Sequence, residues 1–464
     1  MDRRQRSIAL LVAGTYFMEN LDGTIVATAA PSMARSLHVT SGDIGITITA
    51  YLLTLAVLIP LSGWITQRWG VRRIFLTAIV VFTGASALCA ISTNVAELTA
   101  FRVLQGIGGA MMVPVGRLAV LRGTAKSDVI RAIALLTWPA LAAPVIAPVL
   151  GGVFTTYLSW HWIFLVNLPL GVVAFVVALR LVPEVQQEPP PTLDWVGLAL
   201  TCTAVAALVV LADVLAGSRT GWPTVVGLGV LAAALVLAAV LHLLRAEHPL
   251  LQLGILSVTT FLISHRGGSI FRMTVNAVPF LLPLMFQDAF GWTPVKAGVV
   301  VLFVFVGNLT IKPATTPLLM RYGFRTVMVG ATAAAALSMG GNALLTPHTP
   351  LVLTCALLVF GGMARSVGFT AYNTLAFADI PPGDLPAANT LSSTVQQVAV
   401  GFGVAIGAIA LRAGEPVGRW VGLGLPVAPY RIAFLVLAVL TVLPVVESAR
   451  AARTTGNALR AGRS

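Results

Sequence analysis

Two acidic residues, Glu19 and Asp22, lie inside a long apolar segment, Ile8–Pro31. They are three residues apart, so a helix would place both on one face, with Thr15 one turn earlier. A carboxylate at mid-bilayer costs about 2.5–3.5 kcal/mol and is tolerated where it faces water or a partner. A solvated helix end would also accept an acid, but Glu19 lies about 11 residues, roughly 16 Å, into the segment. We therefore expect this face to line a transport pathway and to take up protons.

Cations also occur inside the apolar segments. They are Arg102, Arg117, Arg266, Arg272, Lys312 and Arg365. With two deep acids, four of the six have no evident acidic partner. Arg272 and Arg365 fall near mid-depth, where they could pair with backbone carbonyls or form a cavity wall that attracts a carboxylate, phosphate or phenolate. Arg117 and Lys312 lie nearer the segment ends, where long cationic side chains can extend to the membrane surface.

Uncharged polar, aromatic and thioether side chains are the remaining candidates for contact with an amphipathic substrate. With the two mid-depth arginines, the predicted cavity set is Tyr16, Gln105, Met111, Arg272, Asn276, Arg365, Tyr372 and Asn373. The three cysteines, Cys89, Cys202 and Cys355, lie far apart and have no metal-ligand or disulfide spacing. We expect no metal and no cofactor other than a proton gradient.

Composition indicates the class of protein that must position these residues. Of 464 residues, 57% are hydrophobic and 10% are charged, whereas soluble domains carry about 25% charged residues. The net charge of +13 could suggest nucleic acid, but the cations gather in loops between apolar segments, so we expect no nucleic-acid partner. The first apolar run is too long for a cleavable signal peptide and should be retained.

The apolar segments predict an all-α membrane protein with fourteen spans. They are 8–31, 43–66, 74–92, 96–121, 130–157, 162–181, 193–216, 222–244, 256–287, 294–319, 326–345, 351–378, 385–411 and 427–446. Their connections are short, and no separate soluble domain is expected.

The distribution of Lys and Arg among the loops predicts the orientation. One set of alternate loops contains seventeen such residues and the other set contains six: Arg35, Arg219, Lys296, Arg412, Arg419 and Arg431. Because cytoplasmic loops are enriched in cations, both termini should be cytoplasmic.

An internal repeat suggests how the spans are grouped. The sequence Arg-Trp-Gly-Val-Arg at 68–72 recurs as Arg-Tyr-Gly-Phe-Arg at 321–325, 253 residues later. A six-helix half is shorter than this offset, which two inserted helices would explain. We predict two six-helix bundles, 8–182 and 255–449, an inserted helix pair, 193–245, and a basic cytoplasmic tail, 450–464. Many secondary transporters are built from such repeats, with the site between them.

Five segments together resemble the major facilitator superfamily, in particular its fourteen-helix drug:proton antiporter branch. They are LDGTIV at 21–26 followed by Ala30-Pro31, GWITQRWGVRR at 63–73, FRVLQG at 101–106, PVLGG at 148–152 and SWHWIFLVNLP at 159–169. The resemblance extends over nearly the whole chain, and it implies conformational roles for Gly63, Gln67, Arg68, Gly70, Arg72, Pro148, Gly151 and Gly152.

The sequence departs from the family pattern in two places. Gln67 stands where the loop motif usually has an acid, which implies a weaker or different charge lock at the cytoplasmic side. Ala147 stands where the helix-5 motif usually has glycine, which puts close helix approach in doubt. Pro139, Pro144 and Pro148 nevertheless predict a bent helix, because each removes a backbone hydrogen bond.

The resemblance also implies a role for Arg102 in proton coupling. Asp22 and Arg102 both come out roughly 9–14 Å below the outer surface, so they could pair if their helices are neighbours, as the family fold implies. A static ion pair that only joins two helices is the alternative. Glu19, where the family usually lacks an acid, could instead contact substrate.

The expected function is proton-coupled export of small amphipathic drugs or toxic metabolites by a monomer in a bacterial inner membrane, which would confer antibiotic resistance. Export of anionic amphiphiles attracted by Arg272 and Arg365, flippase-like transport and uncoupled diffusion remain alternatives. An enzyme is not expected, because no nucleophile or metal constellation is present, and the sequence lacks the phosphate loop that ATP drive requires.

Overall fold

The computed structural model describes residues 3–125, 128–184, 192–216, 221–420 and 427–452. All regular elements within these ranges are helical, which confirms the predicted all-α class. The chain divides into two compact units. Unit 1 comprises residues 1–206, 235–253 and 381–394, and unit 2 comprises 207–234, 254–380 and 395–464.

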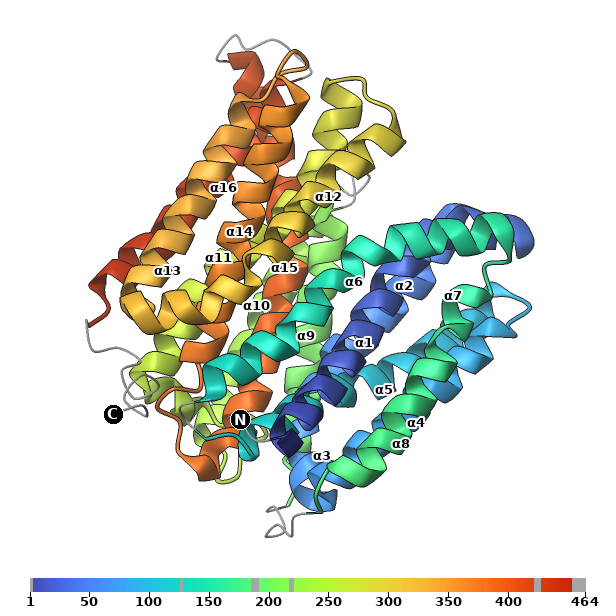
Figure 1. Cartoon of the computed structure of the whole chain (residues 1–464), viewed down its shortest axis with the longest axis vertical. Helices are drawn as coiled ribbons and strands as arrows, with labels where there is room; N and C mark the ends of the chain where they lie inside the picture. Colours follow the sequence, from blue (N-terminus) through green and yellow to red (C-terminus); the bar gives the residue numbers. More distant parts are fainter. Residues whose placement is uncertain (1–2, 126–127, 185–191, 217–220, 421–426, 453–464) are drawn as a thin grey trace. The chain divides into compact units, whose positions relative to one another are not determined.

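Unit 1 is built from the first eight helices, with parts of the next two and the start of α15. These helices are α1 (Arg3–Ser36), α2 (Ser41–Leu58), α3 (Ser62–Trp69), α4 (Val71–Ala90), α5 (Val95–Arg122), α6 (Val129–Tyr157), α7 (Trp162–Leu165), α8 (Asn167–Leu181), α9 (Trp195–Ala216) and α10 (Trp222–Arg245). Within this unit, α6 lies along α1 and α8 lies along α4 (Figure 1).

Unit 2 contains the remaining parts of α9 and α10 and the helices that follow. These are α11 (Thr259–Leu284), α12 (Pro294–Thr310), α13 (Lys312–Leu344), α14 (Leu351–Leu375), α15 (Leu385–Trp420) and α16 (Ala428–Arg450). A π-helical turn, η4 (Met285–Ala289), continues α11, and short 3-10 turns occur at 59–61, 253–257 and 382–384. Within this unit, α16 lies along α13 (Figure 1).

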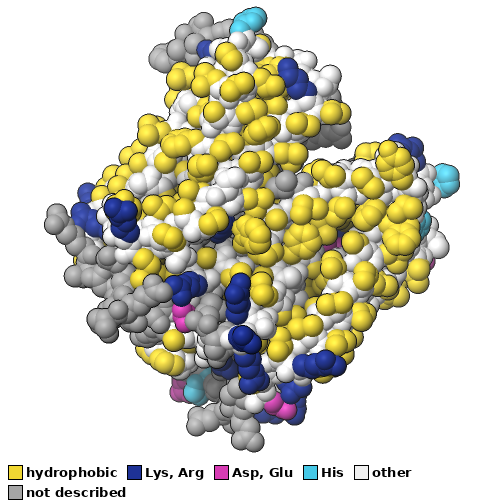
Figure 2. Space-filling view, in the orientation of Figure 1, with side chains coloured by type: hydrophobic (Ala, Val, Ile, Leu, Met, Phe, Trp, Pro, Cys, Tyr) yellow, Lys and Arg dark blue, Asp and Glu magenta, His cyan; other side chains and the backbone are white. Residues whose placement is uncertain are grey.

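Eleven helical segments in the described residues are long and apolar enough to cross a membrane, and the bent α6 would be a twelfth. Hydrophobic side chains cover the flanks of the helices in the space-filling view (Figure 2). Two predicted spans lie on helices outside this set. The helix α12 is shorter, with an apolar part at Val295–Thr310, and α1 contains Glu19, Asn20 and Asp22, which lower its hydropathy. The number fourteen therefore stays a prediction.

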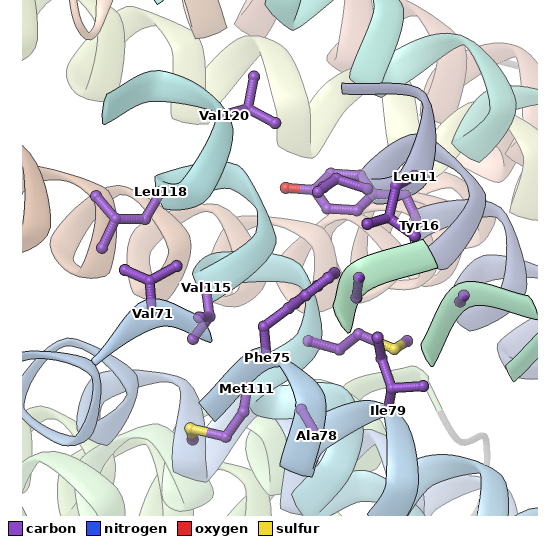
Figure 3. Close-up of a cluster of buried hydrophobic side chains, with 14 of the residues drawn as sticks. Leu11, Tyr16, Val71, Phe75, Ala78, Ile79, Met111, Val115, Leu118 and Val120 are labelled. Atoms are coloured by element: carbon purple, nitrogen blue, oxygen red, sulfur yellow. The ribbon is translucent and has the colours of Figure 1, made fainter. Parts of the chain in front are cut away.

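Close packing in unit 1 depends on small residues where helices approach. A buried cluster that includes Phe75, Ile79 and Met111 joins α4, α5 and α1 (Figure 3). A Cβ atom on Gly108 would lie 2.7 Å from the backbone nitrogen of Phe82, so only glycine allows α5 to lie this close to α4. Small residues at such contacts increase van der Waals packing, which is a main source of helix association in lipid.

The repeated loop motif has the same backbone conformation at both occurrences. Gly70 precedes α4 with φ of 86°, and Gly323 interrupts α13 with φ of 80°. A side chain at such φ values would be strained, which explains why glycine occupies the centre of both copies. The interruption at Gly323 also separates the segments predicted at 294–319 and 326–345.

Prolines bend α6 as the sequence predicts. Its parts Val129–Pro144 and Ile146–Tyr157 differ in direction by 41°. Despite the alanine at position 147, α6 approaches α1 closely, because a Cβ atom on Gly151 would lie 3.1 Å from Thr28 Cβ. The doubt that Ala147 raised about close helix approach is therefore resolved, since Gly151 provides the space.

Asp194 joins the start of α9 to the end of α10 in unit 1. Its carboxylate accepts hydrogen bonds from Gly197 N at 2.7 Å and Leu250 N at 3.3 Å, and it contacts His242 Nε2 at 2.8 Å. Burial alone would raise the pKa of Asp194, but these bonds together hold it below the usual value.

Candidate functional site

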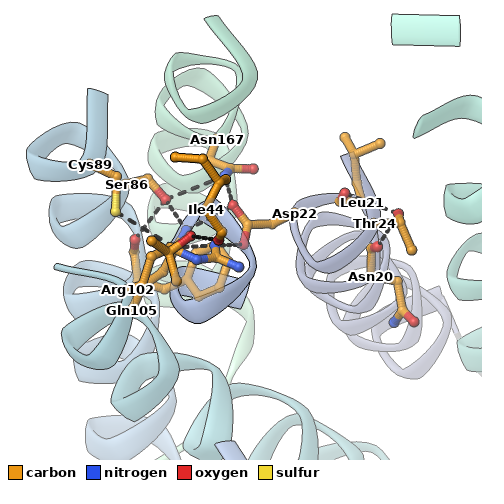
Figure 4. Close-up of polar contacts among 12 residues, drawn as sticks. Asn20, Leu21, Asp22, Thr24, Ile44, Ser86, Cys89, Arg102, Gln105 and Asn167 are labelled. Atoms are coloured by element: carbon orange, nitrogen blue, oxygen red, sulfur yellow. Dashed lines mark hydrogen bonds and ion pairs between the residues drawn. The ribbon is translucent and has the colours of Figure 1, made fainter. Parts of the chain in front are cut away.

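The most deeply buried polar cluster of unit 1 is centred on Asp22 of α1. Arg102 and Gln105 reach it from α5, Ser86 from α4 and Asn167 from the start of α8 (Figure 4). All five side chains belong to fully buried residues with 0% exposure. Four helices therefore bring their polar groups to one point inside the unit.

Asp22 is the acceptor around which the cluster is arranged. Its Oδ2 accepts from Arg102 Nη1 at 2.5 Å, and its Oδ1 accepts from Gln105 Nε2 and Asn167 Nδ2, both at 2.9 Å. Three donors, one of them cationic, thus match the charge of a carboxylate that has no contact with solvent.

Gln105 connects the ion pair to α4. Its Oε1 accepts from the same Arg102 Nη1 at 2.7 Å, while its Nε2 also donates to Ser86 Oγ at 2.7 Å. Asn167 Nδ2 lies 3.3 Å from the same hydroxyl, and Cys89 Sγ lies 3.9 Å from Gln105 Oε1. A change in the charge of Asp22 would therefore alter the hydrogen bonds of side chains on all four helices.

Aromatic rings enclose the guanidinium group of Arg102. Its central carbon lies 4.1 Å from the ring centre of Tyr51 and 5.8 Å from that of Phe164. Arg102 Nε and Nη2 have no acceptor among the described residues. The charge of Arg102 is thus balanced by Asp22 and by ring faces, so loss of the Asp22 charge would leave a buried cation.

Helical spacing explains why these residues meet. Arg102 and Gln105 are three residues apart and so share one face of α5. The helix begins at the cap residue Asn94, whose side chain accepts from Glu97 N. This start places Arg102 about two turns inside the helix.

Glu19 does not join the cluster, although it lies one turn from Asp22. Its Oε2 is buried and has no hydrogen-bond partner among the described residues. Tyr16, a further turn earlier, donates to Val113 O at 3.0 Å. The acidic face predicted for α1 therefore contains one bonded and one unbonded carboxylate.

Four of the predicted cavity residues form two hydrogen bonds in unit 2. Arg272 Nη2 donates to Asn373 Oδ1, and Arg365 Nη2 donates to Asn276 Oδ1, each at 2.8 Å. Tyr372 instead faces Ser448, with 2.9 Å between the two hydroxyl oxygens. In unit 1, Gln105 belongs to the Asp22 cluster and Met111 to the hydrophobic cluster described above.

The remaining intramembrane cations differ from the sequence expectations. Arg117 and Lys312 are 9% and 6% exposed, so neither side chain extends to the surface as its position near a segment end would allow. Arg117 donates to Ser393 at the start of α15, and Lys312 Nζ donates to Thr370 Oγ1 at 2.9 Å. These neighbours provide oxygen atoms that the side chains reach inside the protein.

Arg266 also has a partner that the sequence did not suggest. Its Nε lies 3.3 Å from Glu447 Oε1 across α11 and α16. The expectation that Glu19 and Asp22 are the deep acids available to the six cations is therefore incomplete.

The residues of the predicted conformational motifs lie on turns and helix contacts. Gly63 lies against Thr390, which belongs to the part of α15 in unit 1, and leaves no room for a Cβ atom. Arg72 Nη2 donates to Leu179 O at 2.6 Å. Arg68 is exposed, Gln67 is partly exposed, and Gly152 has open space around it. Pro148 lies inside α6, next to Gly151.

Sequence reasoning gave no role to Ser86, Asn167 or Tyr51. Asn167 lies in the quoted motif SWHWIFLVNLP, which was a usable signal. Ser86 and Tyr51 carry no comparable signal, because single hydroxyl groups in apolar helices usually bond to their own backbone, as Ser86 Oγ also does at 2.9 Å to Phe82 O.

The comparison with protein families gives a match over nearly the whole chain. The model described as "Major Facilitator Superfamily" matches residues 12–264 and 267–455.

Curated bacterial proteins are similar over most of the chain. A Cronobacter sakazakii protein named "Putative multidrug resistance protein MdtD" is 38% identical over 414 residues, which cover 87% of this chain and 85% of the relative. Proteins of the same name from Escherichia coli and Pectobacterium atrosepticum are each 36% identical to this chain. Each alignment covers 86% of this chain, and it covers 85% of the Escherichia coli protein and 86% of the Pectobacterium protein.

Solved structures share the fold at low sequence identity. The human organic anion transporter MFSD10 superposes with a TM-score of 0.67 at 13% identity, over 97% of this chain and 100% of that one. The proton:xylose symporter XylE gives 0.64 at 14% identity, over 97% of both chains.

Proposed function

Since the chain belongs to the major facilitator superfamily and is a transporter rather than an enzyme, we propose that it exports small amphipathic compounds in exchange for protons. The multidrug resistance named in its relatives supports export of drugs or toxic metabolites. The bacterial relatives also support a place in the cytoplasmic membrane.

The observation that carries this proposal is the Asp22–Arg102 pair. A carboxylate and a guanidinium 2.5 Å apart at full burial are suited to coupling, because the stability of the arrangement depends on the charge of both groups. Gln105, Asn167 and Ser86 connect this pair to two further helices, so a change in the charge of Asp22 would act on four helices rather than two.

Protonation of Asp22 would change the balance of the cluster. A neutral carboxyl group cannot balance the charge of Arg102, and an unbalanced buried charge costs several kcal/mol. The protein would then lower its free energy if the four helices of the cluster, α1, α4, α5 and α8, repacked so that Arg102 contacts water or another anion. In this proposal, proton binding favours one access state and substrate binding the other, which is what coupled exchange requires.

The wider arrangement belongs to the same proposal. Two six-helix bundles, 8–182 and 255–449, would alternate in access around the substrate, with the pair 193–245 inserted between them in sequence. Both termini would be cytoplasmic, and the transporter would act as a monomer.

The test is Asp22→Asn, with Glu19→Gln as the companion variant. In proteoliposomes with an imposed pH gradient, Asp22→Asn should abolish gradient-driven export, because its amide cannot take up a proton. It should still exchange labelled for unlabelled substrate, which shows that the variant is folded. A panel of acidic and basic amphiphiles, with and without a protonophore, identifies a usable substrate.

Three results would contradict this proposal. Full gradient-driven export by Asp22→Asn would remove Asp22 from coupling, and loss of coupling in Glu19→Gln alone would assign the proton to Glu19. Substrate flux without proton flux in the wild-type protein would indicate an uncoupled facilitator.

A further inference from the structure

Unit 2 contains two arginine–asparagine pairs that join α11 and α14. Arg272 of α11 bonds to Asn373 of α14, and Arg365 of α14 bonds to Asn276 of α11, each at 2.8 Å. The ring centre of Phe369 lies 4.6 Å from the guanidinium carbon of Arg272 and 5.3 Å from that of Arg365. Two cations therefore share one aromatic ring and are held by neutral amides.

The Arg365–Asn276 pair has unused hydrogen-bond donors. Arg365 Nε, Arg365 Nη1 and Asn276 Nδ2 are all buried and have no acceptor among the described residues. Because Asn276 directs its oxygen to Arg365, its nitrogen must find an acceptor elsewhere. All three atoms are donors, so each of them would be satisfied by an acceptor. Asn342 Oδ1, which also lacks a partner among the described residues, is the one such buried acceptor that belongs to a residue lining the cavity beside Arg365.

The contact differs in charge from the corresponding contact in unit 1. There, Arg102 bonds to a carboxylate, whereas Arg365 bonds to an amide, which has no charge and does not titrate. Among the described residues, no carboxylate forms an ion pair with Arg365, and Glu447 of unit 2 is engaged by Arg266. A buried guanidinium stays protonated, so its counter-ion must come from outside this part of the chain.

A small cavity adjoins this guanidinium group. Arg365, Ser338 and Asn342 contribute polar groups to its wall, and its volume of about 20 Å³ accepts a water-sized group. The Phe305 ring, 6.0 Å from Arg365, adds a second aromatic face to that of Phe369. The cavity therefore has room for one oxygen atom of an anionic group, and two aromatic rings lie near the same guanidinium group.

We propose that Arg365 and Asn276 form the subsite that binds the anionic group of the exported compound, an organic carboxylate with an aromatic part. The carboxylate accepts from Arg365 and Asn276, and the aromatic part packs on Phe369 and Phe305. This inference rests on the proposed export function and adds the charge of the substrate to it.

The test uses three naphthalene probes that differ in charge: 1-naphthoate, 1-naphthamide and 1-naphthylmethylammonium. Binding to the purified full-length protein is measured by titration calorimetry in a low-chloride buffer. The wild-type protein should bind the carboxylate at least tenfold more tightly than the amide or the ammonium compound. This is the difference expected from one charge-assisted hydrogen bond.

Two variants should remove this preference by different routes. Arg365→Gln deletes the cation, and Asn276→Asp supplies an internal carboxylate that competes with the ligand, as Asp22 does for Arg102. Each should lose at least tenfold in affinity for 1-naphthoate and keep the affinity for 1-naphthamide. Arg266→Gln, which removes an arginine from α11, the helix of Asn276, is the matched control and should bind like wild type.

Three results would overturn the proposal. The first is that the wild-type protein shows no preference for the carboxylate, and the second is that Asn276→Asp leaves the affinity for 1-naphthoate unchanged. The third is that inorganic phosphate binds equally tightly, which would indicate a site for inorganic anions only. In Asp22→Asn the preference for 1-naphthoate over 1-naphthamide should persist while gradient-driven export is lost, so failure of proton coupling and failure of this subsite give different results.

Discussion

Asp22 and Asn276 differ by one group, an oxygen in place of an amide nitrogen, and that group sets the charge of the arginine contact that each residue makes. The Asp22–Arg102 contact is neutral overall, and its charge changes when a proton binds. The Asn276–Arg365 contact remains positive over the physiological pH range. At the scale of residues, we thus propose proton exchange at the first contact and anion binding at the second.

The hydrogen bonds of Asn167 should have a measurable effect on stability. Asn167→Ala removes the donor to Asp22 Oδ1 and leaves a buried carboxylate with one partner fewer, which should cost about 1–3 kcal/mol. Thermal unfolding in detergent should show a lower midpoint than in wild type. The control is Asn20→Ala, because Asn20 Nδ2 bonds only within its own helix, to Tyr16 O. Equal midpoints for the two variants would mean that the bond to Asp22 adds no stability.

Helices in this fold approach each other closely at glycine residues, which have no Cβ atom. Gly151 lets α6 lie against α1, the helix that carries Asp22, and Gly108 does the same for α5 and α4. These contacts set how far each polar side chain must reach to join the cluster. The positions of helices therefore determine the distances between the charged groups.

Gly151 and the adjacent Gly152 give a matched test of this packing. In Gly151→Ala, the new Cβ atom would lie 3.1 Å from Thr28 and 3.2 Å from Ile25, so overpacking should cost about 1–3 kcal/mol. In Gly152→Ala, the Cβ atom meets nothing within 4 Å, and the better helix propensity of alanine should add up to about 1 kcal/mol. Melting midpoints should move in opposite directions. A shift in the same direction and of the same size would show that helix propensity, not packing, dominates.

For the molecule as a whole, the membrane orientation predicted from the loop charges can be measured directly. Green fluorescent protein fused after Ser464 should fluoresce, because it folds in the cytoplasm, whereas alkaline phosphatase at the same place should be inactive. Alkaline phosphatase fused in the loop after Ala216 should be active, since this loop belongs to the set with few cations. The opposite pattern of activities would reverse the predicted orientation.

The sequence was sufficient to predict the fold class and the possibility of an Asp22–Arg102 pair, because equal depths follow from the rise of 1.5 Å per residue. It was insufficient to predict Ser86, Tyr51 and the Arg266–Glu447 pair. Which face of a helix meets which neighbour depends on the packing of several helices at once, and spacing along one segment does not contain this information.

Arg117 is a second example of a contact that spacing along one segment does not predict. Its position near a helix end suggested contact with the membrane surface, yet a hydroxyl group 276 residues later in the chain binds it inside unit 1. Long side chains near helix ends can turn either way, so the partner decides the outcome.

The thiol of Cys89 gives the native chain a reporter next to its ion pair. Cys89 is buried, and its sulfur lies 3.9 Å from Gln105, which bonds to both Asp22 and Arg102. In a protein whose other two cysteines are replaced by serine, a membrane-permeant maleimide can reach this sulfur only when the four helices separate. The rate of alkylation would therefore report how often the helices around the Asp22–Arg102 pair separate during turnover, without an introduced cysteine.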